Sequence, residues 1–305
     1  MKSEKKHTLT PLAVPLLVSV LLVLLVIGRT LLSGGADADT SVSEQLLRLS
    51  VVQIVIYVFP CIIYYFLKGR RLNTGFMLSA VGPGNLLFIF VSTFMLIAGN
   101  LLIKYLYYVT GTGKPTGVDH LVSDLSVLAD ASPAMVLIAL ALVPAVCEEL
   151  FFRGLVLSEY KIYGTFNAVM FSAVCFSMIH FSVSAFPLYL FSGVVLGMTA
   201  AVTRSVFVSI SIHFISNVLS IYMSDSFMRV SVQKSGKFFV LFILMTVFVV
   251  SCILVAAVAE RICYRRATDN EPRPESRSID NIAAVFLSPG FFGLALVFLL
   301  IIILI

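Results

Sequence analysis

Long apolar runs recur along the whole chain and limit the folds that it can adopt. Nine of them lie at approximately 11–32, 46–67, 85–109, 133–158, 164–182, 185–203, 205–223, 237–260 and 282–305. A run of about 18 or more apolar residues is long enough for a helix to cross a bilayer. Hydrophobic residues make up 59% of the 305 residues and charged residues 12%, which leaves more apolar surface than a water-soluble fold can cover.

The continuity of these runs predicts helices rather than strands. Inside lipid each backbone N–H and C=O must be paired within the protein, and a membrane β-barrel would need short alternating segments instead. We therefore predict an all-α polytopic membrane protein, a bundle of eight to nine transmembrane helices. The last run is interrupted by Ser288-Pro289-Gly290. If only 291–305 is helical, it extends about 22 Å, which is short for a full span.

Basic residues follow alternate runs and predict the orientation of the chain. Under the positive-inside rule they place the N-terminus in the cytoplasm and the C-terminus outside. Each even-numbered helix then ends on the cytoplasmic side. The residues concerned are Lys68, Arg70, Arg71, Arg153, Lys161, Arg204, Arg261, Arg265 and Arg266. The net charge of +5 is thus explained by topology, and no nucleic-acid partner is expected. The first run is longer than the apolar region of roughly 7–15 residues in a signal peptide, so we expect an uncleaved anchor in a multi-pass protein of the cell membrane.

Two loops divide the chain into three parts. Apolar residues at helical spacing within 118–130, interleaved with Asp119, Asp124 and Asp130, predict a short helix on the outer interface. Charged residues and prolines in 264–281 predict a flexible cytoplasmic linker. We therefore expect an N-terminal part at 1–132, a catalytic core of helices four to seven at 133–223, and a C-terminal part at 224–305. The five cysteines show no CxxC spacing and are interpreted as packing residues.

The fourth run contains the charged residues that are hardest to explain in a membrane. Glu148 and Glu149 are adjacent carboxylates in an apolar helix, where charged groups are costly and repel each other. Glu149 and Arg153 are four residues apart, so they share a helix face and can form an ion pair. Glu148 points about 100° away, which leaves it without a local partner. This pattern favours a functional role for Glu148.

Two further runs contribute imidazole and amide groups. His180 lies in the fifth run, four residues after Phe176, and His213 and Asn217 lie four apart in the seventh. Each can be explained by interhelical hydrogen bonding alone. Because His213 and Asn217 share a face, they can also donate to one point, as an oxyanion hole requires.

The three motifs together resemble those of the CPBP membrane proteases, which include the CAAX prenyl endopeptidases. That family has EExxxR, then FxxxH, then HxxxN or HxxxD, on separate transmembrane helices. This chain has Glu148-Glu149 with Arg153, Phe176 with His180, and His213 with Asn217, in the same order. The resemblance covers roughly 133–223.

This resemblance implies a role for each residue. Glu148 acts as the general base, His180 helps to hold and activate a water molecule, and His213 and Asn217 stabilise the oxyanion. Glu149 and Arg153 give support by pairing, and Phe176 completes the second motif. The implied activity is intramembrane endopeptidase cleavage of a peptide or membrane-protein segment, with a prenylated C-terminal CAAX peptide as the best-known substrate of the family. No cofactor is required.

The depths of these residues agree only in part. Counted at about 1.5 Å per residue from the expected cytoplasmic helix ends, Glu148, His213 and Asn217 lie roughly 12–18 Å deep and His180 about 24 Å. A later start of the fifth helix, or a tilt, is needed to bring His180 level.

Two alternatives use the same residues. Glu148, His180 and His213 could ligate Zn²⁺ with an open position for water, although the chain has no HExxH helix. Alternatively, the protein is non-catalytic, as in relatives linked to bacteriocin immunity, or is a transporter that buries polar groups along a path.

Overall fold

The computed structural model describes residues 10–34, 41–67, 77–111, 131–222, 233, 235–267 and 279–305. The predicted interfacial helix at 118–130 lies outside these ranges, as does most of the predicted linker. Within the described ranges the regular structure is helical, apart from an isolated backbone bridge between Leu78 and Ser205. The expectation of an all-α fold is confirmed.

Six helical stretches are long and apolar enough to cross a membrane. They are α2 (Thr10–Gly34), α3 (Val42–Leu67), α4 (Pro83–Thr110), the composite helix that starts with α7 at Pro133 and ends at Tyr163, α11 (Phe186–Thr203) and α14 (Lys237–Ala267). Three shorter apolar helices complete the bundle: α10 (Thr165–Met178), α12 (Val206–Tyr222) and α16 (Pro289–Leu304). The protein is therefore an integral, multi-pass membrane protein.

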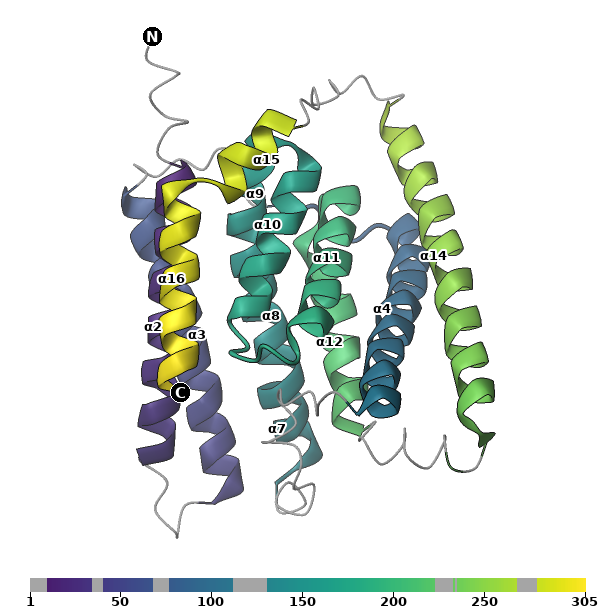
Figure 1. Ribbon diagram of the computed structural model, residues 1–305, viewed down its shortest axis with the longest axis horizontal. Helices are drawn as coiled ribbons and strands as arrows, with labels where there is room; N and C mark the ends of the chain where they lie inside the picture. The colour runs from purple at the N-terminus through teal and green to yellow at the C-terminus, as the bar shows by residue number, and fades with distance from the viewer. Residues whose placement is uncertain are drawn as a thin grey trace.

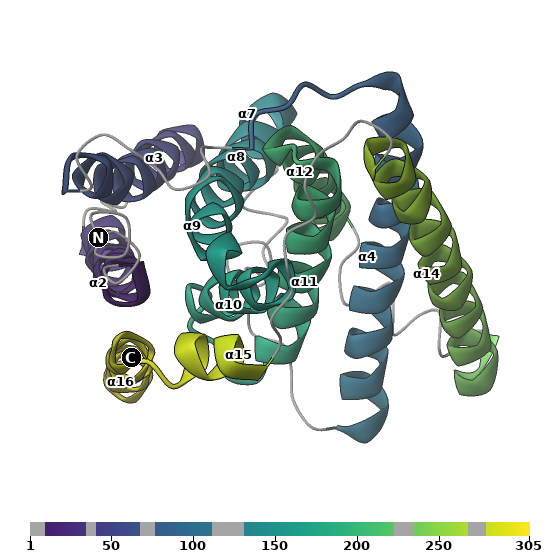
Figure 2. The same ribbon diagram turned by 90° about the horizontal axis from the view of Figure 1, so that it is seen from above.

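The helices run up and down in a bundle with the composite helix, α10, α11 and α12 at its centre (Figure 1). Viewed from above, α2, α3 and α16 lie on one side of this centre and α4 and α14 on the other (Figure 2). We call the end at which α2 begins the entry end and the opposite end the far end. A short helix, α15 (Ile279–Phe286), lies across the entry end and joins the linker region to α16.

The composite helix contains two π-helical stretches on either side of the glutamates. It consists of α7 (Pro133–Leu137), the π stretch η1 (Ile138–Leu142), α8 (Val143–Glu149), the π stretch η2 (Leu150–Leu157), α9 (Ser158–Tyr160) and a 3₁₀ turn η3 (Lys161–Tyr163). Pro144 follows η1 and has no N–H for the helical ladder, which the wider turn accommodates. Such π turns are often found at functional sites.

The fourth helix ends later, and the fifth earlier, than the apolar pattern predicts. We expected ends at 158 and 182, but the composite helix continues to Tyr163 and α10 stops at Met178. Glu159 causes the first difference: although charged, it is fully buried and accepts a 2.9 Å hydrogen bond from the Tyr64 hydroxyl of α3.

The new boundaries account for the depth of His180. Glu148 is 15 residues before Tyr163, and His180 is 15 residues after Thr165 and two beyond the end of α10, so both are roughly 22 Å from the connection between the two helices. They are therefore level, because the fourth helix is longer than predicted rather than because the fifth begins later.

The C-terminal boundaries also differ from the prediction. Helix α14 extends to Ala267, into the stretch that we expected to be linker. The last run is broken at the predicted place, where the Ser288 side chain accepts a hydrogen bond from the Phe291 N–H and caps α16. With 16 residues, α16 is about 24 Å long and is shorter than a typical span.

Helix α11 packs against α10 through two glycines spaced four apart. A Cβ atom on Gly193 would lie 2.8 Å from the Ala173 Cα atom, and one on Gly197 would lie 3.1 Å from the Val169 side chain. Small residues at this spacing let membrane helices approach closely. This approach fixes the position of α11 beside the glutamate-bearing helix.

Candidate active site

The first motif forms a buried ion pair. The Arg153 guanidinium donates to a Glu149 carboxylate oxygen at 2.8 Å, and both side chains are fully buried. The predicted pairing is confirmed. A second Arg153 nitrogen donates to the Gly193 carbonyl oxygen at 3.1 Å, and the guanidinium lies 4.6 Å from the centre of the Phe176 ring. Arg153 is therefore held by contacts from three helices.

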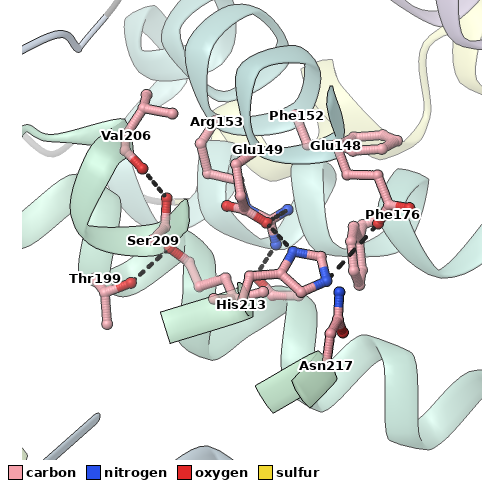
Figure 3. A network of polar contacts seen from close by, with 12 residues as sticks. Glu148, Glu149, Phe152, Arg153, Phe176, Thr199, Val206, Ser209, His213 and Asn217 are labelled. Atoms are coloured by element: carbon pink, nitrogen blue, oxygen red, sulfur yellow. Dashed lines mark hydrogen bonds and ion pairs between the residues drawn. The ribbon is translucent and has the colours of Figure 1, made fainter. Parts of the chain in front are cut away.

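The imidazole of His213 lies between the two carboxylates. Its Nδ1 atom is 2.9 Å from Glu149 Oε1, and its Nε2 atom is 4.0 Å from Glu148 Oε2 (Figure 3). Because an ionised carboxylate only accepts hydrogen bonds, the contact with Glu149 places the proton on Nδ1. In the neutral ring the Nε2 lone pair then faces Glu148.

Phe176 is the packing link between the two histidines. Its ring makes edge contacts with both imidazoles, at centroid distances of 5.8 Å to His213 and 5.0 Å to His180. It also makes an edge contact with Phe152 of η2, at 5.6 Å. Phe176 thus packs against both imidazole rings and against η2.

Asn217 lies beside the His213 ring, on the same face of α12 (Figure 3). Its amide nitrogen donates to the Ala141 carbonyl oxygen at 3.4 Å, a long hydrogen bond to the π stretch η1. An amide held by such a weak bond can turn to another acceptor at little cost.

His180 lies just beyond the end of α10, in the connection to α11. Its Nδ1 atom is 2.9 Å from the Phe176 carbonyl oxygen, and its ring stacks on Tyr189 with centroids 3.5 Å apart. The next residue, Phe181, has a φ of +49°, a conformation that costs energy for a bulky residue and occurs mainly at functional sites. The structure thus brings Glu149, Arg153 and His213 into direct contact, places Glu148 4.0 Å from His213, and joins His180 to His213 through the Phe176 ring, which contacts both.

The comparisons with known proteins identify the segment that carries this site. Residues 130–219 match the family model described as type II CAAX prenyl endopeptidase Rce1-like. The matched segment is similar to type II CAAX prenyl endopeptidases. The matched segment includes all seven residues that the three motifs singled out. No match was found among curated proteins or among solved structures.

The candidate site includes contacts that the motifs do not reveal. Gly193 contributes a backbone carbonyl to Arg153, and Tyr189 contributes the ring on which His180 stacks. The Gly193–Gly197 spacing is a visible signal for close helix packing. The stacking partner Tyr189 has no comparable sequence signal, because it depends on where α10 ends.

The positions of the site residues also show whether Glu148, His180 and His213 could together bind zinc. Among the residues that the structure describes, no three His, Cys, Asp or Glu side chains are grouped so that they could hold a metal ion. Within the proposed set, His180 and His213 each pack against the Phe176 ring, and the His213 Nδ1 atom is 2.9 Å from Glu149. The residues do not fit a three-ligand zinc site in this arrangement.

Proposed function

We propose that this protein is an intramembrane endopeptidase that hydrolyses a peptide bond with a water molecule activated by Glu148. The observation that carries the proposal is the His213 ring, which is hydrogen-bonded to Glu149 on one side and faces Glu148 on the other. Two acidic groups thus have different surroundings: Glu149 is paired with Arg153, and Glu148 has only the unprotonated side of an imidazole across from it.

The distance between Glu148 and His213 suits a water molecule. A separation of 4.0 Å is too long for a direct hydrogen bond, and a polar gap of this size is commonly bridged by water. There the water donates one hydrogen to Glu148 and the other to the Nε2 lone pair of His213. Both contacts leave a lone pair of the water oxygen free to attack a carbonyl carbon.

The reaction then proceeds without a covalent enzyme intermediate. As the water oxygen bonds to the carbonyl carbon, Glu148 takes its proton and the carbonyl π electrons move to oxygen. When the C–N bond breaks, Glu148 returns the proton to the leaving amine nitrogen, and a carboxylic acid and an amine result. A positioned general base of this kind contributes typically about 10²–10⁴-fold to the rate.

Asn217 and His180 have supporting roles in this proposal. The Asn217 amide, now on a long hydrogen bond to Ala141, turns to donate to the oxyanion. His180 and Glu148 are level in the bundle. Once substrate lies between them, His180 helps to hold and activate the water molecule. Glu149 acts through His213, whose ring orientation and proton position it sets.

The similarity of residues 130–219 to CAAX prenyl endopeptidases supports a peptide substrate, and we propose further that it carries a lipid. A site about 22 Å along membrane helices is reached most easily by a peptide that is itself held in the bilayer. We also propose that the entry end faces the cytoplasm, in agreement with the basic residues that follow alternate apolar runs.

The decisive experiment replaces Glu148 with glutamine, which keeps the size of the side chain but cannot accept a proton. Purified protein in lipid nanodiscs is incubated with an S-farnesylated CAAX peptide, and the products are measured by mass spectrometry. We expect Glu148→Gln to abolish cleavage while its thermal unfolding stays close to that of the wild type. The control is Glu44→Gln, a change in an exposed ion pair with Arg48. Undiminished turnover by Glu148→Gln would refute the assignment of the base.

A further inference from the structure

A hollow between α4 and α12 lies next to the proposed active site. It is lined by Asn100 and Lys104 of α4 and by Ser216 and Ser220 of α12, with leucine and isoleucine side chains completing its walls. The two helices pack against each other (Figure 2). Ser216 directly precedes Asn217, the proposed oxyanion donor.

The two serines of the hollow keep their hydroxyl groups free for another partner. Many helical Ser and Thr hydroxyls donate to the carbonyl oxygen one turn earlier in the same helix, as at Ser50, Thr93, Ser177, Thr203 and Ser211, although the Ser92 hydroxyl of α4 does not. Within the described residues Ser216 and Ser220 make no such bond. In an apolar layer a hydroxyl without a partner is unfavourable, so this pair is expected to bind something else.

Asn100 and Lys104 add donors of hydrogen bonds to the same hollow. The Asn100 carbonyl oxygen accepts a hydrogen bond from the Ser192 hydroxyl at 3.1 Å, which leaves its NH₂ group to donate elsewhere. Lys104 is half-buried in a span, and among the described residues it has no carboxylate partner. An unpaired cation in a span is costly and usually marks a functional site. Among the described residues that line it, the hollow therefore offers an ammonium, an amide and two hydroxyls but no acidic side chain, which suits an anion.

The distance from the active site indicates which anion fits. Ser220 is seven residues beyond His213 on α12, about 10 Å along the helix. Three residues of an extended peptide cover about the same length. We propose that this hollow binds the free C-terminal carboxylate of the substrate peptide, about three residues beyond the bond that is cleaved. The inference rests on the proposed function and makes Lys104 a specificity-determining residue.

The test measures binding rather than cleavage, so it is independent of whether the protein hydrolyses the peptide. The probe is a fluorescent S-farnesylated hexapeptide in two forms, one with a free C-terminal carboxylate and one with a C-terminal amide. Binding to Glu148→Gln protein is followed by fluorescence anisotropy in dodecyl maltoside, which contains no phosphate. We expect the acid to bind at least tenfold more tightly than the amide. Adding Lys104→Gln should reduce this ratio to about one, and Lys104→Arg should restore most of it.

A matched control is available at the far end of the neighbouring helix. Lys237 begins α14 and is outside the hollow, so Lys237→Gln should leave both affinities unchanged. If Lys104→Gln is poorly folded, the double change Ser216→Ala and Ser220→Ala should lower the ratio in its place.

Two results would overturn the proposal. One is an equal affinity for the peptide acid and the peptide amide, or a preference for the acid that survives both Lys104→Gln and the double change Ser216→Ala and Ser220→Ala. The other is retention of phosphatidylglycerol in native mass spectrometry that depends on Lys104 while the two peptides bind alike, which would make the hollow a site for a lipid phosphate. Loss of cleavage in the wild type with a normal acid preference would instead contradict only the proposed function.

Discussion

Glu149 and His213 are 64 residues apart in the sequence and share a 2.9 Å hydrogen bond in the centre of the bundle. The same carboxylate oxygen also accepts the hydrogen bond from Arg153. The Glu149 carboxylate therefore both compensates the buried charge of Arg153 and orients the imidazole of His213. Its removal is expected to affect stability and catalysis together.

The first prediction concerns the buried ion pair. Glu149→Leu leaves the Arg153 guanidinium without its partner, and we expect a destabilisation of about 3–5 kcal/mol, as is typical when one member of a buried pair is lost. The double change Glu149→Leu and Arg153→Met should be more stable than Glu149→Leu alone. Thermal unfolding in detergent measures both. A double variant that is no more stable than Glu149→Leu would show that the unpaired Arg153 guanidinium is not what destabilises the single variant.

The second prediction concerns the proposed oxyanion donor. Asn217→Ala should lower kcat by roughly 10²–10³-fold and leave KM within a few-fold of the wild type, because the interaction is used mainly in the transition state. Steady-state kinetics with the farnesylated peptide check this. A rise in KM at constant kcat would assign Asn217 to substrate binding instead.

The third prediction concerns the close approach of α10 and α11. Gly193→Ala places a methyl group 2.8 Å from the Ala173 Cα atom, so the helices must separate, and we expect a loss of about 1–3 kcal/mol together with weaker activity. The control is Gly84→Ala, because a Cβ atom there has no neighbour within 4 Å. Similar unfolding temperatures for the two variants would argue against close packing at Gly193.

The fourth prediction concerns metal dependence. Treatment with EDTA or 1,10-phenanthroline should leave the cleavage rate of purified protein unchanged, because the site uses a carboxylate and an imidazole to activate water. Elemental analysis of the same preparation accompanies the assay. Stoichiometric zinc whose removal abolishes activity and whose return restores it would support the zinc mechanism.

The residues of the site could be found from the sequence because their spacing is local. Glu149 with Arg153, and His213 with Asn217, are each four apart, and an α-helix places such residues on one face whatever surrounds it. The apolar runs predicted the helices because the length and composition of a run are also local properties of the sequence. What the spacing could not show is that His213 bonds to Glu149, because this contact depends on how α8 and α12 pack.

The errors at helix ends also have local causes. Glu159 is polar in sequence, so the fourth helix was expected to end near it, but burial beside Tyr64 allows the helix to continue. The apolar pattern runs on through Ile179 and Phe181 without a break, so it does not reveal that α10 has ended. The turn there is formed by Ser182, whose hydroxyl accepts the Ala185 N–H. A single serine is too common to predict it.

The early end of α10 has a consequence for how water reaches the interior of the protein. With 14 residues, α10 is about 21 Å long, and its connection to α11 stops well short of the far end reached by α2 and α3 (Figure 1). Peptide groups in a non-helical connection at this level cannot be solvated by acyl chains and need either protein partners or hydration. Tyr107 supplies one such partner, at the Ser184 carbonyl oxygen. The amides of His180, Phe181, Ala185 and Phe186 are hydrogen-bonded, whereas within the described residues those of Ser182, Val183 and Ser184 are not. These three should exchange with deuterated solvent faster than the amides of the helices on either side, and would mark an inlet for the water that the proposed hydrolysis consumes.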